Sequence, residues 1–482
     1  MGVDIGLSDR CNLNCAWCYT TGGHCKGPNL ELSKRVVEWH LSQLDDKTQK
    51  THVSIYGGEP LFEWETLKAF GEYLVERRKS WGKPISSTIV TNCSLITQDK
   101  LDWLKAHDIG ISTSIDGCPE AIDRFRIYRA NGKGSSAEVI AGVELAHRNK
   151  MGHSARATCG PENLPLFAKS IKYLAEEMRF RTVNMILAGG ASWKMSDIPV
   201  LREQVREVNT WWLEKLKAAG TSRDVPSLYH IRNVLHCIGG GRGHRICGAG
   251  AHKGRVGVDM VENLWPCHRF CNSRTDEMWK IGTLETGATN ERLMHAIRHF
   301  DITKDIEGAE CANCPWAKYC YCICWHEVAQ SRRARFVGDR IKITPDPFWC
   351  ETWRTYYASV QEDIIAPLGA DNPLLEPMLH PEKEQKRQQE ARRKEIEAKK
   401  AAAKAAGGCG ATCNCHKPKA AGSPRITPAQ IPGGMACDKR GAQIGEREIT
   451  VRVAAFACPK HSDGVTLKDC VACKKEQATN AA

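Results

Sequence analysis

Short apolar runs alternate with longer amphipathic stretches along the first part of the chain, up to about residue 220. The apolar runs predict six strands, at Val3–Leu7, Val53–Tyr56, Ser87–Val90, Ile109–Ser114, Ser154–Thr158 and Thr182–Ile186. Apolar residues at helical spacing predict helices between them, including Leu32–Leu44, Trp64–Arg77, Ala137–Arg148 and Leu166–Met178. Strands that alternate with helices favour right-handed βαβ units and a parallel sheet. Six units fit a partial (β/α)6 barrel of the TIM type, an α/β fold whose chemistry gathers at the carboxyl ends of the strands.

The pattern changes after about residue 225, where glycine, cysteine and tryptophan become frequent and the strand–helix repeat stops. Glu and Lys or Arg at helical spacing, with little apolar face, predict an exposed helix over Pro381–Ala406. Glycine, alanine, proline and cysteine dominate the end of the chain and predict disorder. We therefore expect a core barrel over 1–225, a small cysteine-rich domain over 226–365, a charged helical spacer over 366–406 and a Cys-rich tail over 407–482.

The number of cysteines limits the kind of protein this can be. The chain has 24 cysteines in 482 residues, yet it has no secretory signal sequence and no apolar run long enough to span a membrane. Dense cysteine without secretion favours metal or cluster binding in a reducing cytoplasm over a disulfide framework. The sequence thus predicts a cytoplasmic protein without a membrane span.

The formal net charge of +12 raises the question of nucleic-acid binding. Much of the excess lies near Lys383–Lys404 and Lys417–Lys419. Glutamates are interleaved there and aromatic residues are missing, which favours a solvated basic helix and tail over a surface for nucleic acid.

Three cysteines directly after the first predicted strand carry the strongest indication of chemistry. Cys11, Cys15 and Cys18 have the spacing C-x3-C-x2-C and are followed by Tyr19. Three thiolates can hold three corners of a cubic iron–sulfur cluster and leave the fourth iron open to a small molecule. A zinc site would require a fourth ligand close by, and none completes the set.

With this spacing the sequence resembles the radical S-adenosylmethionine (radical SAM) enzymes. The second strand ends in Tyr56-Gly57-Gly58-Glu59-Pro60, similar to the family's GGEP motif, which implies a grip on the amino group of S-adenosylmethionine. A plain strand-to-helix turn with Pro60 at the helix start is the alternative. Asn92 after the third strand and Ser114 to Gly117 after the fourth resemble two further family segments, and the stretch around Arg126 is typical of the peptide-modifying branch.

The resemblance implies a set of cofactor-binding residues: Tyr19, Gly57, Gly58, Glu59, Pro60, Asn92, Ser114 and Arg126. Cys93 and Cys118 stand where the family usually has glycine and proline, and we interpret them as small buried residues.

A second group of cysteines resembles the SPASM domain, which carries auxiliary clusters in radical SAM peptide maturases. Cys311, Cys314, Cys320 and Cys324 have the spacing C-x2-C-x5-C-x3-C, with further cysteines upstream and downstream. The resemblance implies one cluster on Cys311, Cys314, Cys320 and Cys350, and another on Cys247, Cys267 and Cys324. Cys237 is the candidate that would complete the set of Cys247, Cys267 and Cys324, called here the first auxiliary cluster, and Cys271 or an open iron is the alternative. Glu262 replaces a usual glycine, which weakens the ligand assignment, and a structural zinc site is the alternative.

The function implied is reductive cleavage of S-adenosylmethionine to a 5′-deoxyadenosyl radical that modifies a peptide or protein. His268 directly follows Cys267, where sulfatase-maturating enzymes have aspartate, so a thioether or other cross-link at Cys is favoured over formylglycine formation. His268 is the candidate catalytic proton acceptor, and a buried structural histidine is the alternative. A non-catalytic iron–sulfur electron carrier is a competing class, and a nucleic-acid-modifying enzyme is a third.

The expected partners are a Cys-containing peptide substrate and an electron donor of the flavodoxin or ferredoxin type. Ten residues precede Cys11, so we expect leader-peptide recognition by a separate protein or by the SPASM region. The seven tail cysteines allow three roles: a metal site, a thiol-rich appendage that delivers electrons or clusters, or a substrate-like segment fused to its own maturase.

Overall fold

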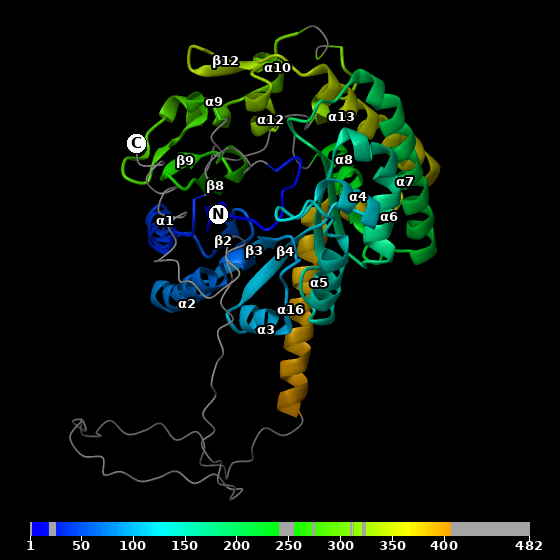
Figure 1. The fold of residues 1–482 in the computed structure, drawn as a ribbon. Coiled ribbons are helices and arrows are strands. Elements are labelled where there is room, and N and C mark those ends of the chain that lie inside the picture. Colours follow the sequence, from blue (N-terminus) through cyan, green and yellow to red (C-terminus); the bar gives the residue numbers. More distant parts are fainter. Residues whose placement is uncertain are drawn as a thin grey trace, which may run out of the picture. The chain divides into compact units, whose positions relative to one another are not determined.

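The computed structural model describes residues 2–18, 26–240, 255–271, 275–308, 311, 313–320 and 324–405 of the chain (Figure 1). Contacts divide the chain into a unit that ends at Ala403 and a second unit from Lys404 to Ala482. The tail over 407–482, with its seven cysteines, lies outside the described residues, and its three possible roles stay predictions.

Six parallel strands pair in chain order and confirm the expected α/β barrel sheet. They are β1 (Gly2–Gly6), β2 (Thr51–Tyr56), β3 (Ile85–Thr91), β4 (Ile109–Ser114), β5 (Ser154–Cys159) and β6 (Thr182–Leu187). Each has a buried, largely β-branched or small apolar face that suits a sheet covered by helices.

Both edges of this sheet are extended by strands that lie beyond residue 225. β7 (Ser227–Leu228) pairs in parallel with β6, and β8 (Arg255–Val258) pairs in parallel with β1. Short antiparallel strands continue from β8: β9 (Asn263–Trp265), β10 (Gly282–Thr283) and β11 (Gly287–Ala288). The division into domains at 225 stays a prediction, but the sheet itself crosses that point.

Helices separate the strands along the chain. They are α1 (Leu30–Ser42), α2 (Trp64–Trp81), α3 (Gln98–Ala106), α4 (Pro119–Phe125), α5 (Ser136–Arg148), α6 (Phe167–Glu176), α7 (Ile198–Ala219) and α8 (Tyr229–Ile238). The Asn29 side chain caps α1 by accepting from the Leu32 N–H, and Gly82 ends α2 in the left-handed conformation. In Figure 1, α2, α3 and α5 lie outside β2, β3 and β4.

The two faces of each strand differ in polarity. On β5, Ala155, Ala157 and Cys159 are buried in the core under the helices, whereas Arg156 and Thr158 face the other way and are more exposed. β3, β4 and β6 alternate in the same manner. Alternation with period two therefore gives the sheet an apolar helix side and a polar, accessible inner side.

The part after residue 255 has mostly short elements and ends in a long helix. They are α9 (Glu291–Arg298), α10 (Ile302–Asp305), α12 (Trp325–Gln330), the hairpin β12 (Ala334–Val337) and β13 (Arg340–Ile343), α13 (Pro347–Val360), a π-helical turn (Gln361–Ile365), α14 (Ala366–Leu368), α15 (Glu376–Leu379) and α16 (Pro381–Ala405). α13 packs against α7 and α8, with Tyr357 fully buried. α16 covers the predicted charged helix. In the described part of the chain, no helix combines the length and the apolar character needed to cross a bilayer.

Candidate functional site

The cysteine loop, residues 11–18, follows β1 and is fixed by backbone hydrogen bonds to the end of α4 and the residues after it. The Asn14 N–H donates to the Ile127 carbonyl over 2.8 Å, and the Ala16 N–H donates to the Phe125 carbonyl over 3.2 Å. These bonds set the loop across the carboxyl ends of the strands, where a parallel barrel places its chemistry.

The thiols of Cys11, Cys15 and Cys18 are half-buried and close enough to influence one another's charge. Burial raises the pKa of Cys11 to about 12, helped by the nearby Glu59, and burial raises that of Cys15 to about 11. Such thiols become thiolates when they bind metal, because the metal replaces the proton. Three sulfurs on one short loop therefore fit the three protein ligands of a cubic cluster.

A site for a single metal ion has a different requirement from a cluster site, because all of its ligands must surround one point. Within the described residues, no three His, Cys, Asp or Glu side chains surround one point as ligands of a single metal ion. In a cubic cluster the three cysteine sulfurs bind three different irons, so they do not have to meet at one point.

Gly57 and Gly58 bring the end of β2 against the start of the cysteine loop. The Gly58 N–H donates to the Ser8 carbonyl over 2.7 Å. A Cβ atom would lie 2.2 Å from Ser8 O at position 57 and 2.0 Å from Arg10 O at position 58. The contact with this backbone thus requires glycine at both positions, and this requirement does not depend on a ligand.

Glu59 is buried and its carboxylate is fully engaged by the protein. Its Oε1 accepts from the Leu61 N–H (3.0 Å) and the Thr91 hydroxyl (2.8 Å), and its Oε2 accepts from the Asn92 N–H (2.7 Å). Burial raises its pKa, against the effect of these bonds. Glu59 therefore connects the end of β2 to the end of β3. Pro60 begins the 3-10 helix Pro60–Glu63, as expected for a strand-to-helix turn.

Asn92 connects this turn to the cysteine loop. Its Nδ2 donates to Asn12 Oδ1 over 3.0 Å and lies 3.9 Å from Cys11 Sγ. The Asn12 amide in turn donates to the Ser94 hydroxyl. Three of the predicted regions, the cysteine loop, the β2 turn and the end of β3, are thus one hydrogen-bonded unit.

Arg126 forms a buried ion pair next to Cys15. Its Nε and Nη2 donate to Asp116 over 2.7 and 2.8 Å, and its Nη1 lies 3.8 Å from Cys15 Sγ. Two of its guanidinium nitrogens are therefore occupied by Asp116. Ser114 ends β4 opposite Arg156 of β5, at the same edge of the sheet.

Two predicted residues cannot be placed. Tyr19 and Cys247 lie outside the described residues, so their roles stay predictions.

His268 and Arg255 both contact the buried carboxylate of Asp4. Its Nδ1 is 2.8 Å from Asp4 Oδ2, and Arg255 Nε is 3.1 Å from Asp4 Oδ1. Burial raises the pKa of Asp4, but the hydrogen bond and charge of His268 and the charge of Arg255 outweigh it and lower that pKa. A carboxylate that accepts from one ring nitrogen orients the other, which suits both a structural and a catalytic histidine.

Two of the ligands predicted for the first auxiliary cluster, Cys267 and Cys324, lie close to Arg269. Its Nη1 lies 3.2 Å from Cys324 Sγ, and its charge interacts with Cys267. Cys271 Sγ lies 3.8 Å from the Cys267 carbonyl. Cys271 shares a core with Cys267, whereas Cys237 of α8 is buried in the other core, so the geometry favours Cys271 as the neighbour of Cys267.

The second predicted set lies beside the first. The Cys314 N–H donates to the Cys311 carbonyl in a turn, and a 3-10 helix leads from there to Cys320. Cys350, in the first turn of α13, and Cys324 line one small cavity. The two predicted auxiliary sites are therefore neighbours.

Several residues of the site could not have been selected from the sequence. Asp4 lies far along the chain from both Arg255 and His268, and the pairing of Asp116 with Arg126 depends on the fold of the segment between them. His326 is buried, neither ring nitrogen has a hydrogen-bond partner in the described part, and burial lowers its pKa to about 3. Only their positions beside cysteine motifs could have drawn attention to Arg269 and His326.

Comparison with known proteins finds a family model that is similar to the first part of the chain. Residues 5–190 match the model of the Radical SAM superfamily. The protein MJ0907 of Methanocaldococcus jannaschii is 28% identical over 170 residues, which are 35% of this chain and 57% of that protein. The chain thus spans a little over half of that relative.

Longer matches reach the second part of the chain. The radical SAM cyclopropyl synthase TigE of Paramaledivibacter caminithermalis is 20% identical over 341 residues, 67% of each chain. The cysteine-type anaerobic sulfatase-maturating enzyme of Clostridium novyi is 20% identical over 377 residues, 73% of this chain and 92% of the enzyme. The solved structure of native anSMEcpe with bound AdoMet has a TM-score of 0.57 at 17% identity and covers 76% of this chain and 98% of that one, which shows a common fold.

Proposed function

We propose that this protein cleaves S-adenosylmethionine reductively and modifies a peptide or protein substrate, because residues 5–190 match the model of the Radical SAM superfamily. The modification we propose is a thioether or other cross-link at a cysteine. When bound, a [4Fe–4S] cluster on the cysteine loop supplies the electron for cleavage, and auxiliary clusters accept the electron that the substrate loses.

The hydrogen-bonded unit of cysteine loop, β2 turn and β3 end carries this proposal. The Glu59 N–H donates to the Arg10 carbonyl over 3.0 Å, and Asn92 connects Glu59 to Asn12. The backbone of Gly57 to Glu59 therefore stands at the edge of the cysteine loop, where it can hold the amino group of a cofactor. With its carboxylate engaged, Glu59 positions this backbone, while the Arg126–Asp116 pair closes the site on the Cys15 side.

The names of relatives support a peptide substrate. One relative is a sulfatase-maturating enzyme, and a solved structure of the same fold holds a peptide named Kp18Cys together with AdoMet. Cross-link formation removes two hydrogens from the substrate. One is abstracted by the radical, and the other leaves as a proton and an electron. His268, oriented by Asp4, is the residue that we propose to take this proton.

The first test uses the anaerobically reconstituted protein and S-adenosylmethionine with a chemical reductant. Replacing Cys11, Cys15 and Cys18 together by Ala should abolish 5′-deoxyadenosine formation and remove about four iron atoms. The matched control is Cys118→Ala, a buried cysteine of the same barrel, which should keep both. Formation of 5′-deoxyadenosine at the parent rate in the triple variant would falsify the cluster assignment.

The alternatives give different results in the same assay. A non-catalytic electron carrier would not form 5′-deoxyadenosine at all. Mass spectrometry of synthetic Cys-containing peptides after turnover separates the two modifications: a cross-link loses two hydrogens and leaves no alkylatable thiol, whereas formylglycine loses the sulfur.

A further inference from the structure

Each of the three predicted cluster sites contains an arginine that is paired with a carboxylate and lies near a cysteine of the site. Arg126 pairs with Asp116 next to Cys15, and Arg269 pairs with Glu327 next to Cys324. The third pair is Arg354 with Glu351, at the site predicted around Cys314 and Cys350. The sequence motifs do not include these arginines as ligands, so their repeated position calls for a physical reason.

Arg269 is held tightly at the first auxiliary site. Its Nη1 lies 3.2 Å from Cys324 Sγ and 3.3 Å from Glu327 Oε1. Burial lowers the pKa of Arg269, but the charges of Cys324, Glu327 and Cys267 outweigh this effect and raise that pKa. A Cβ at Gly189, after β6, would lie 2.7 Å from its Nη2, so the guanidinium also touches the carboxyl edge of the barrel. Its side chain is 23% exposed, and that of Glu327 17%.

Arg354 of α13 occupies the matching position at the second auxiliary site. Hydrogen bonding to Cys314 is the main cause that raises its pKa, and the charges of Cys314 and Cys350 add to it. Its Nη1 lies 3.5 Å from Glu351 Oε2. With 34% exposure, Arg354 is more solvated than Arg269.

We propose that Arg269 and Glu327 set the reduction potential of the auxiliary cluster held by Cys267 and Cys324, Arg269 raising it and Glu327 lowering it. This rests on the auxiliary clusters of the proposed function. Reduction adds one negative charge to a cluster, so a nearby cation stabilises the reduced form more than the oxidised form, and a nearby carboxylate does the opposite. Partial burial strengthens both effects, because solvent screens them less.

The test is a redox titration of the anaerobically reconstituted full chain at pH 8, followed by electron paramagnetic resonance. Cys324→Ala and Cys314→Ala identify the signal of each auxiliary cluster. Arg269→Gln should shift the Cys324 cluster to a lower potential by at least a tenfold change in its reduced-to-oxidised ratio, about 59 mV for one electron. Arg269→Lys, which keeps the charge, should shift it by less than half as much.

Two further variants fix the sign and the site. Glu327→Gln should raise the potential of the same cluster. Arg354→Gln should lower the potential of the Cys314 cluster and leave the Cys324 cluster unchanged. If Arg269→Gln cannot hold its cluster, Glu327→Gln decides alone: a rise supports the proposal, and no change or a fall overturns it.

Failure of this inference can be told from failure of the proposed function. If the parent protein holds no auxiliary iron, the cluster assignment fails and this inference with it. If both auxiliary signals are present but Arg269→Gln changes the ratio less than twofold, only the role of Arg269 fails.

Discussion

At the scale of single residues, the site depends on close backbone contacts more than its motif letters suggest. The sequence predicted that Gly57, Gly58 and Glu59 bind a cofactor, with a plain strand-to-helix turn as the alternative. The structure adds that both glycines lie against the carbonyls of Ser8 and Arg10, and that Glu59 bonds three partners on β3 and its own turn. Such contacts join residues far apart in the chain, so no local pattern could have revealed them.

Gly58→Ala tests this contact directly. Its Cβ would lie 2.0 Å from Arg10 O, so backbone must move, and overpacking of this kind costs about 1 to 3 kcal/mol. We expect a lower Tm and a clear loss of 5′-deoxyadenosine formation, because the displaced segment leads into Cys11. Gly27→Ala is the control, since nothing lies within 4 Å of that added Cβ. Equal activity in the two variants would contradict the contact argument.

At the scale of elements, periodicity was a good guide inside the barrel and for the charged helix α16, and a poor one in the cysteine-rich part between them. β4 has the predicted bounds, and the other five strands differ by at most two residues at either end. The two-residue strand β7 and the strand β8 have no recognisable local pattern. Their partners, β6 and β1, come from distant parts of the sequence. Likewise, Arg269, Glu327 and Cys324 come together only through the packing of α12 against the 267–271 segment.

A glycine inside α5 shows how packing overrides helix propensity. Alanine is the better helix former by about 1 kcal/mol, yet a Cβ at Gly142 would lie 2.0 Å from Cys93 O. Cys93 itself has a φ of +65°, so this turn already holds a conformation unusual for a side-chain residue. We expect Gly142→Ala to destabilise the protein by about 1 to 3 kcal/mol in thermal unfolding.

The comparison for this prediction is Ala141→Gly, the neighbouring exposed position. It changes propensity alone and should cost about 1 kcal/mol or less. A Gly142→Ala protein that is more stable than the parent would mean that the helix can shift away from Cys93.

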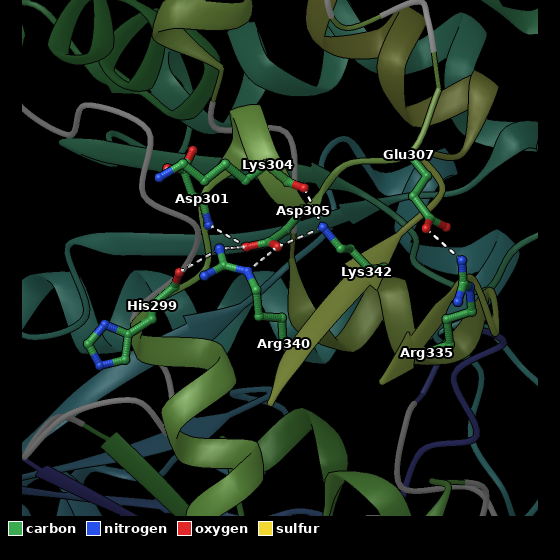
Figure 2. A network of polar contacts seen from close by, with 8 residues as sticks. All are labelled: His299, Asp301, Lys304, Asp305, Glu307, Arg335, Arg340 and Lys342. Atoms are coloured by element: carbon green, nitrogen blue, oxygen red, sulfur yellow. Dashed lines mark hydrogen bonds and ion pairs between the residues drawn. The ribbon is translucent and has the colours of Figure 1, made fainter. Parts of the chain in front are cut away.

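At the scale of the whole molecule, ion pairs connect the segments on either side of the cysteine block. Figure 2 shows Asp305 of α10 between Arg340 and Lys342 of β13, and the nearby pair Glu307–Arg335. The residues between these segments include Cys311, Cys314, Cys320 and Cys324. Asp305 is 1% exposed and also accepts from the Asp301 N–H over 2.9 Å. The Asp305 contacts therefore close the loop that carries the predicted cluster ligands.

Arg340→Met should be among the more damaging surface-proximal changes in this part of the chain. It leaves a buried carboxylate with Lys342 as its remaining cation. Breaking a buried pair costs about 3 to 5 kcal/mol, and because Arg340 is 35% exposed we expect a loss at the lower end of that range. Arg335→Met, in the exposed pair with Glu307, should cost less than about 1 kcal/mol. The double variant Arg340→Met with Asp305→Asn should lose less than the sum of the single changes, because the two groups act together.

The pH dependence of this effect follows from the direction of the Asp305 shift. Burial raises the pKa of Asp305, but the hydrogen bonds from Arg340, the Asp301 backbone and Lys342, with the charge of Arg340, outweigh it and lower the pKa. A lowered carboxyl pKa gives stability that is complete above the unfolded value, about 3.9, and is lost only as the pH falls through the folded value. The Tm difference between the parent and Asp305→Asn should therefore stay constant from pH 6 to 8, a range in which iron–sulfur proteins can be handled. A difference that shrinks within this range would show that Asp305 is not held as a carboxylate by Arg340 and Lys342, and that the cysteine block is closed by other contacts.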